Sequence, residues 1–283
     1  MTIDKLILHP RTMALVKKYA SHLPNGLIID GPTGTGVATV ATALAQAVGS
    51  PPFRIEPKKK VKGEWAIDPH DGSVIIDDIR GLYELTRAKQ PGKHVYIIDT
   101  GEKSLTLAAQ NAFLKLLEEP RSGLHFIIAT HRPDLLLPTI PSRCQRLTLL
   151  PITDEQTADL LSTFAISDVT KRARLAFVGQ GRPALTRQLA NDSELYEARV
   201  QIMTDAKVLI GSDPYEKMAV IQRYRDKRAE ALTLLDDMNR QLQTVIRKQP
   251  DAKLAADIDK HLQTRDRIAA GGNIRLQLAS DVI

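Results

Sequence analysis

The residues most able to do chemistry lie in one glycine-rich run, GPTGTGVAT, which begins at Gly31 and ends at Thr39. Such glycines let backbone N–H groups turn toward a phosphate, and a helix that starts directly after them adds positive potential. The full phosphate-loop pattern places a lysine and then a hydroxyl residue after its last glycine, here Gly36. Val37 takes the place of the lysine and Ala38 that of the magnesium-binding hydroxyl. Thr39 comes one residue late, a rotation of about 100° on a helix, so it does not replace that hydroxyl. Taken alone, the run also fits an ordinary glycine-rich turn.

A second candidate group is the carboxylate of Asp99, which ends the apolar run HVYIID and is placed to hold magnesium. The next residue is Thr100, where many nucleotide-hydrolysing enzymes carry the glutamate that activates water, and a threonine is no base at neutral pH. General-base catalysis is typically worth ~10²–10⁴-fold. Its loss, together with that of the phosphate lysine, predicts no useful hydrolysis. A self-contained ATPase or nucleotide-dependent switch with an unconventional loop stays open as an alternative.

These groups need a scaffold that brings strand ends together. Apolar runs predict strands over 26–30, 94–99, 124–130 and 146–150, and helical spacing predicts helices over 37–48, 73–89 and 104–118. Near-continuous apolar strands fit a parallel sheet that is covered on both faces. Residues 1–150 are therefore predicted to form a parallel α/β sheet with right-handed crossovers.

Two stretches differ from this pattern. Residues 50–72 are predicted to form a Pro-containing loop with a lysine cluster at Lys58, Lys59, Lys60 and Lys62. After Pro151 only helical periodicity is found, over 153–208 and 213–283, with breaks at 179–183, 211–214, 249–250 and 271–272.

Composition narrows the function classes. The chain has 283 residues, a formal charge of +6 and a pI near 9.3, which permits contact with a polyanion without requiring it. Aromatic residues make up 4%, which argues against a stacking platform for single strands. A single cysteine, Cys144, excludes an internal disulfide and a multi-cysteine zinc site. We find no secretory signal and no membrane span, so a cytoplasmic protein is expected.

The most specific signal lies in residues 94–146. The runs HVYIIDTGEKSLTLAAQNAFLKLLEEP and FIIATHRPDLLLPTIPSRCQR resemble the clamp-loader branch of the AAA+ ATPases, and in it the delta-prime subunits of bacterial DNA polymerase III. IIDDIRGLYEL at 75–85 and GQGRPAL at 179–185 are similar to segments of the same family. The resemblance implies an AAA+ α/β domain over 1–150, a helical lid over 151–208 and a helical collar for oligomerisation over 209–283.

The resemblance also implies roles for individual residues. Arg143, in the Ser-Arg-Cys triplet, corresponds to an arginine finger that reaches the ATP site of an adjacent subunit, where a guanidinium stabilises charge on the transferring phosphoryl group. The structural alternative is an arginine that caps a helix or pairs with a carboxylate. Thr130 corresponds to the first sensor, or is only a strand-end threonine, and Arg182 corresponds to the second sensor, or only starts a helix. The degenerate nucleotide site is thus predicted to comprise Gly31, Gly34, Gly36, Val37, Ala38, Thr39, Asp99, Thr130 and Arg182.

The implied function is a non-hydrolysing subunit that helps load the sliding clamp onto primed DNA, with neither ATPase nor polymerase activity of its own. Its implied partners are a gamma/tau-like ATPase subunit, a delta-like subunit, the sliding clamp and, through the complex, primer-template DNA. No cofactor is expected to be required, although residual binding of ATP, ADP or phosphate stays open. Zinc is not expected, because residues 40–93 lack the four cysteines that many relatives carry there. The lysine cluster that replaces them either meets DNA phosphates or is a solvated loop. A DNA-binding adaptor outside the polymerase complex is a further alternative.

Overall fold

The computed structural model describes residues 2–69, 72–87, 92–119 and 122–282. They form two compact units, Met1–Ala190 and Asn191–Ile283. The first unit holds all the strands found in the described residues, and the second is built from helices. Among the described residues, no helix is both long and apolar enough to span a bilayer.

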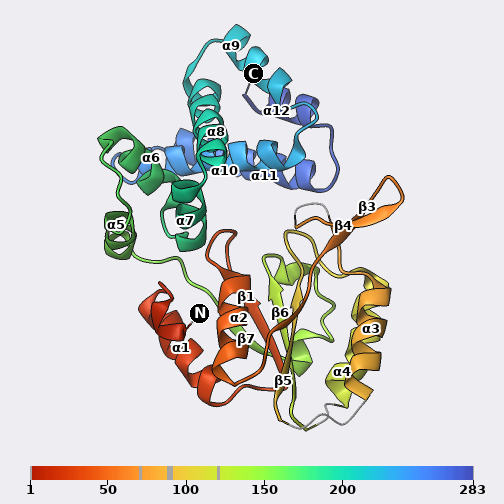
Figure 1. Ribbon diagram of the computed structural model, residues 1–283. Helices are drawn as coiled ribbons and strands as arrows, with labels where there is room; N and C mark the ends of the chain where they lie inside the picture. The colour runs from red at the N-terminus through yellow and green to blue at the C-terminus, as the bar shows by residue number, and fades with distance from the viewer. Residues whose placement is uncertain (1, 70–71, 88–91, 120–121, 283) are drawn as a thin grey trace. The chain divides into compact units, whose positions relative to one another are not determined.

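A five-stranded parallel sheet organises the first unit (Figure 1). Its order is β2-β5-β6-β1-β7, and the strands are β1 (Gly26–Asp30), β2 (Phe53–Ile55), β5 (His94–Asp99), β6 (Leu124–Thr130) and β7 (Gln145–Thr148). β1 and β6 are buried along their whole length, as their unbroken apolar sequences predict. The predicted parallel α/β sheet is confirmed, and β2 is an additional edge strand.

Helices cover both faces of this sheet (Figure 1). On one face α1 (Pro10–Ser21) and α2 (Val37–Ala47) pack with β1 and β7, following the short 3₁₀ helix η1 (Ile3–Lys5). On the other face lie α3 (Ile76–Arg87) and α4 (Leu107–Glu118). The predicted helix over 73–89 is confirmed from Ile76 to Arg87, whereas Ser73 and Val74 form β-bridges before it; Ala88 and Lys89 lie outside the described residues.

Residues 50–72 are not the loop that we predicted. They contain β2 and an antiparallel hairpin of β3 (Lys58–Val61) and β4 (Glu64–Ile67). A two-residue turn at Lys62 and Gly63, with φ of 50° and 94°, joins these strands. Positive φ at both positions belongs to the type I′ turn, which matches the twist of paired strands. The hairpin therefore follows from turn chemistry, although its lysine-rich sequence hides the strands.

The second half of the chain is helical in its described residues, as predicted. In the first unit, the 3₁₀ helices η2 (Pro133–Leu135) and η3 (Pro141–Arg143) precede β7, and three helices follow it: α5 (Asp154–Ser162), α6 (Val169–Gly179) and α7 (Pro183–Asn191). Thr153 and Gln156 form a reciprocal capping box at the start of α5, and Asp168 caps α6.

The second unit contains α8 (Ser193–Gly211), α9 (Pro214–Arg223), α10 (Arg228–Ile246), α11 (Ala252–Ala269) and α12 (Ile274–Val282). The predicted boundary between lid and collar at 208/209 falls inside α8, which is one continuous helix. The two units divide at 190/191 instead, because α8 packs along α10 in the core of the second unit. The predicted boundary at 150/151 does not coincide with a division between compact units.

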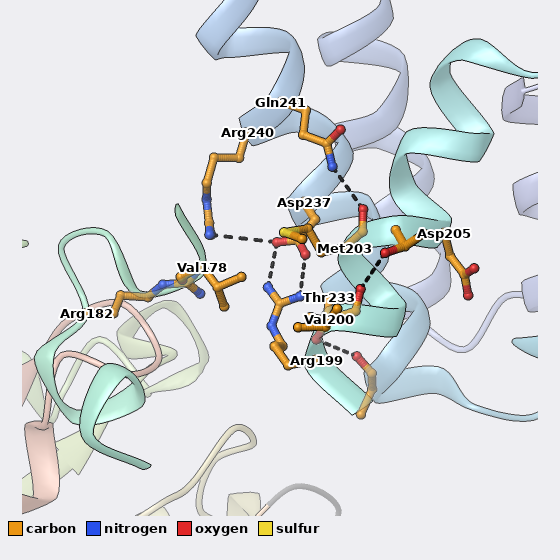
Figure 2. Close-up of polar contacts among 12 residues, drawn as sticks. Val178, Arg182, Arg199, Val200, Met203, Asp205, Thr233, Asp237, Arg240 and Gln241 are labelled. Carbon is orange, nitrogen blue, oxygen red and sulfur yellow. Dashed lines mark hydrogen bonds and ion pairs between the residues drawn. The ribbon is translucent and has the colours of Figure 1, made fainter. Parts of the chain in front are cut away.

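A buried ion pair lies between α8 and α10 (Figure 2). Both terminal guanidinium nitrogens of Arg199, Nη1 and Nη2, contact the carboxylate of Asp237, whose side chain has no exposed surface. Arg240 lies 3.7 Å from the same carboxylate, and the Gln241 amide donates to the Met203 carbonyl at 3.2 Å. Such a pair fixes the register of the two helices, because a single carboxylate satisfies both donors of the fork.

Candidate functional site

The glycine-rich loop lies between β1 and α2, as its sequence predicts. Gly34 and Gly36 have φ of 89° and 95°, a region that only glycine adopts without strain. Gly31 is required for a different reason: a Cβ there would lie 2.9 Å from Cβ of Leu149 and 3.0 Å from Oγ1 of Thr35. The loop therefore needs glycine at these three positions.

The side chains that follow the loop carry no charge. Val37, at the lysine position, is 2% exposed and packs in the core beside Ile29 and Val40. Ala38 is partly buried and brings no hydroxyl, and Thr39 is exposed on the surface of α2. The position that supplies charge in an active loop thus contributes apolar packing here.

The first turn of α7 closes over the loop. The Gly34 carbonyl accepts the N–H groups of Ala184 and Leu185, at 3.0 and 3.2 Å. These N–H groups belong to the start of a helix, where no partner within the helix exists, so the loop caps α7. A Cβ on Gly34 would lie 2.8 Å from Cβ of Leu185 and 3.3 Å from Cβ of Arg182. The predicted second-sensor residue thus lies beside the loop, and its guanidinium donates to the Val178 carbonyl at 2.7 Å.

The remaining space beside the loop is small. A cavity of about 70 Å³ is lined by Thr35, Gly36, Thr39, Ala184 and Arg187, among others. Pockets for small molecules and cofactors typically measure ~300–1,000 Å³. The cavity at this position is therefore smaller than a typical cofactor pocket.

Asp99 is paired with a residue that the sequence analysis missed. The guanidinium of Arg54, on β2, contacts the Asp99 carboxylate and lies 3.3 Å from Glu56. The other carboxylate oxygen of Asp99 accepts the Gly101 N–H at 3.0 Å. Both oxygens of the predicted magnesium ligand are therefore used within the chain. Only the recognition of β2 as a strand parallel to β5 could have revealed this contact.

Thr100 and Thr130 close the same end of the sheet. The Thr100 hydroxyl donates to the Thr130 hydroxyl oxygen at 2.9 Å, and both residues are almost fully buried. The Thr130 oxygen also accepts the Arg132 N–H at 3.1 Å. The residue at the catalytic-base position and the predicted first sensor thus satisfy one another, and neither points to solvent.

These residues do not fit a nucleotide-bound magnesium ion. Asp99 carries a guanidinium, and Ala38 brings no hydroxyl. Within the ranges that the structure describes, no cluster of three or more His, Cys, Asp or Glu side chains is arranged to hold a metal.

Arg143 lies apart from this site, at the end of η3. Its guanidinium contacts Glu118 at the end of α4 at 2.8 Å and donates to the Thr139 carbonyl at 3.0 Å. The two side chains are 36% and 49% exposed, so the ion pair is a surface one. Exposed pairs of this kind are typically worth ~0–1 kcal/mol, so a stronger partner can displace Glu118 at little cost.

The backbone beneath Arg143 is closely packed. A Cβ on Gly26 would lie 2.8 Å from the Cys144 sulfur and 3.3 Å from the Arg143 carbonyl. Burial raises the pKa of the Cys144 thiol to about 11, which keeps it protonated at neutral pH. Cys144 is thus a packing residue that holds the η3 segment against β1.

The strand order, the loop between β1 and α2 and the helices that follow β7 define the AAA+ class of P-loop proteins. Two solved structures share this fold: a DNA polymerase III gamma subunit-related protein of Thermotoga maritima and the RuvB Holliday junction branch migration motor of the same organism. The first has a TM-score of 0.52 and 17% identity and covers 96% of this chain and 97% of its own. The second has a TM-score of 0.50 and 15% identity and covers 91% and 84%.

Residues 12–153 match the model of the family described as "DNA polymerase III, delta subunit", and the chain belongs to this family. Relatives named DNA polymerase III subunit delta′ include the Haemophilus influenzae protein, at 31% identity over 49% of this chain and 48% of that protein. The Pseudomonas aeruginosa protein is 25% identical over 94% and 86%, and the Bacillus subtilis protein 29% over 71% and 65%. The match thus spans about half of the H. influenzae protein and most of the P. aeruginosa one. The chain is a delta-prime-like AAA+ protein of the clamp-loader family of DNA replication.

Proposed function

We propose that this chain is a non-hydrolysing subunit of a DNA polymerase III clamp loader, which supplies Arg143 to the ATP site of a neighbouring subunit. The ion pair between Arg54 and Asp99 carries the first half of this proposal. A cation fixed within the chain takes the carboxylate that an active site would use for magnesium. The burial of Val37 and the Thr100–Thr130 pair support the same conclusion.

The surroundings of Arg143 support the second half. An arginine that acts on another subunit must be reachable and must leave its resting partner easily. Arg143 meets both conditions, because its side chain is 36% exposed and its partner Glu118 is more exposed still. The planar guanidinium can then form two parallel hydrogen bonds to phosphate oxygens, which a lysine cannot do.

The partners proposed on this basis are a gamma/tau-like ATPase subunit, a delta-like subunit, the sliding clamp and primer-template DNA. Relatives of this chain include the tau subunit of B. subtilis, at 35% identity over 50% of this chain and 27% of that protein. We propose that the chain itself requires neither bound nucleotide nor metal.

The test is reconstitution of the complex with Arg143→Ala, followed by measurement of clamp- and DNA-stimulated ATP hydrolysis. Arginine fingers are typically worth ~10³–10⁵-fold in kcat. We therefore expect hydrolysis at the adjacent site to be lost while assembly is unchanged. Arg143→Lys should be nearly as deficient, since it keeps the charge but not the fork.

Arg132→Ala is the matched control. Arg132 is 41% exposed and also pairs with a neighbouring carboxylate, that of Asp134, but is not proposed to face a nucleotide. Full hydrolysis by the Arg143→Ala complex would contradict the assignment of the finger. ATP hydrolysis by the isolated wild-type chain would instead favour a self-contained nucleotide switch.

A further inference from the structure

The β3–β4 hairpin, labelled in Figure 1, is rich in lysine, and the proposed function does not use it. Residues 58–67 contain four lysines against one glutamate, together with the single tryptophan of the chain, Trp65. All four residues of β4 are exposed, and Trp65 itself is 52% exposed. A large aromatic ring left in water among lysines is not explained by the packing of the fold.

The register of the hairpin gathers these groups on one face. Lys60 pairs directly with Trp65, and the next residues on that face, Lys58 and Ile67, also pair. Directly opposite residues of an antiparallel pair point to the same side. The Lys60 ammonium accordingly lies 5.9 Å from the centre of the Trp65 ring, within the range of a cation–π contact.

The base of the hairpin is held in place. The Lys58 ammonium contacts Asp78 at 2.8 Å, and the backbones of Lys58 and Ser73 exchange two hydrogen bonds. The Glu102 N–H, in the loop that follows β5, donates to the Pro69 carbonyl at 2.9 Å. Lys58 is therefore an anchoring residue, while Lys60, Lys62 and Trp65 lie toward the free end of a positioned arm.

We propose that this hairpin binds single-stranded DNA directly, with an unpaired base stacked on Trp65 and the flanking phosphates on Lys60 and Lys62. An aromatic ring takes any base without regard to sequence, and lysines neutralise the backbone. A protein partner is disfavoured, because lysine is depleted in protein–protein interfaces. Duplex DNA is disfavoured because its bases are already stacked. The chain has few aromatic residues, but its one tryptophan lies next to the lysine cluster, where a single stacking ring is sufficient.

The experiment titrates a labelled oligothymidylate with the full chain, followed by fluorescence anisotropy. Trp65→Thr keeps a strand-forming residue but removes the ring, and we expect binding to weaken at least about fivefold, since a stacked base is worth ~1–3 kcal/mol. Trp65→Tyr should restore most of the binding. An abasic oligonucleotide should bind the wild-type chain as weakly as oligothymidylate binds the Trp65→Thr variant.

The charge contribution is tested separately. Lys60→Gln with Lys62→Gln should lower the slope of log Kd against log salt by about 1.4, because each phosphate contact on a single strand contributes ~0.7. Lys17→Gln with Lys18→Gln, on α1, removes the same charge from exposed positions in the same unit and should leave the slope unchanged.

Three results would overturn the proposal. One is equal binding of oligothymidylate by the wild-type chain and by Trp65→Thr, with unchanged circular dichroism. Another is an equal loss in the α1 control, which would indicate diffuse attraction by net charge. The third is tighter binding of a blunt duplex, or of an acidic polypeptide, than of the single strand. Since the measurement uses the isolated chain, its outcome is independent of Arg143 and of the assembled complex.

Discussion

The guanidinium of Arg54 lies against the carboxylate of Asp99, and two neighbouring parallel strands bring the pair together. In the register of β2 and β5, Ile55 pairs with Ile98, so Arg54, which precedes Ile55, and Asp99, which follows Ile98, both lie on the opposite face of the sheet. A metal ion at this carboxylate would have to displace a cation that the fold already provides.

A double-mutant cycle on this pair should give a measurable coupling energy. We expect Arg54→Ala and Asp99→Asn to be coupled by about 1 kcal/mol in urea unfolding, at the upper end for ion pairs that are partly exposed. The Arg54 and Asp99 side chains are 39% and 13% exposed. The Arg80–Asp77 pair, at 69% and 72%, is the control and should show a coupling of no more than about 0.3 kcal/mol. Equal coupling in the two cycles would mean that the Arg54–Asp99 pair is no more than a surface contact.

Gly34→Ala should destabilise the protein more than Gly49→Ala. Both glycines have similar φ, 89° and 81°, so an alanine is strained equally at each, by about 1–2 kcal/mol. A Cβ on Gly49 meets no atom within 4 Å, whereas one on Gly34 meets Cβ of Leu185 at 2.8 Å. The difference between the two variants in thermal unfolding measures the contact between the loop and α7. Equal losses of stability in the two variants would show that α7 moves away from the loop without a cost in free energy.

Cys144 should resist alkylation in the folded protein. Burial raises the pKa of its thiol from 9.0 to about 11, and the thiolate is the reactive form. We expect slow reaction with iodoacetamide at pH 8, a rate that rises until about pH 11, and rapid reaction once urea unfolds the chain. Because the folded state holds the proton more tightly, this group stabilises the fold below pH 9.0 and loses that contribution as pH rises through about 11. Rapid labelling of the native protein at pH 8 would contradict the burial of the thiol.

Removing only one partner of the Arg199–Asp237 ion pair should strongly destabilise the protein. Arg199→Met leaves the fully buried Asp237 carboxylate with only the more distant Arg240, and we expect a loss of about 3–5 kcal/mol. Replacing both partners, with Asp237→Leu added, should recover part of that loss, because the buried carboxylate is removed together with its guanidinium and only Arg240 then loses a contact. Urea unfolding followed by circular dichroism provides the measurement. A double variant less stable than Arg199→Met would indicate that the pair itself is net stabilising.

The central strands could be predicted from sequence because β1, β5 and β6 are continuous apolar runs that the sheet buries on both faces. β2 could not, since it has only three residues, two of them exposed, and one is the charged Arg54. Its contact with Asp99 was missed for the same reason.

The sequence does not predict the β3–β4 hairpin or the division between the two units, for two other reasons. The lysines of β3 give no alternation of apolar and polar residues, so only the Lys62–Gly63 turn signals the hairpin. The predicted boundary at 208/209 lies inside α8, because nothing within this helix marks a break and its helical periodicity runs on to Gly211. Pattern alone does not show which neighbour a helix packs against.

The N–H groups of Ala184 and Leu185 donate to the Gly34 carbonyl, so α7 is held against the loop without a nucleotide. The chain's own peptide groups provide the contacts that tie α7 to the loop. We therefore expect the setting of α7 against the sheet to stay constant when the ratio of ATP to ADP changes.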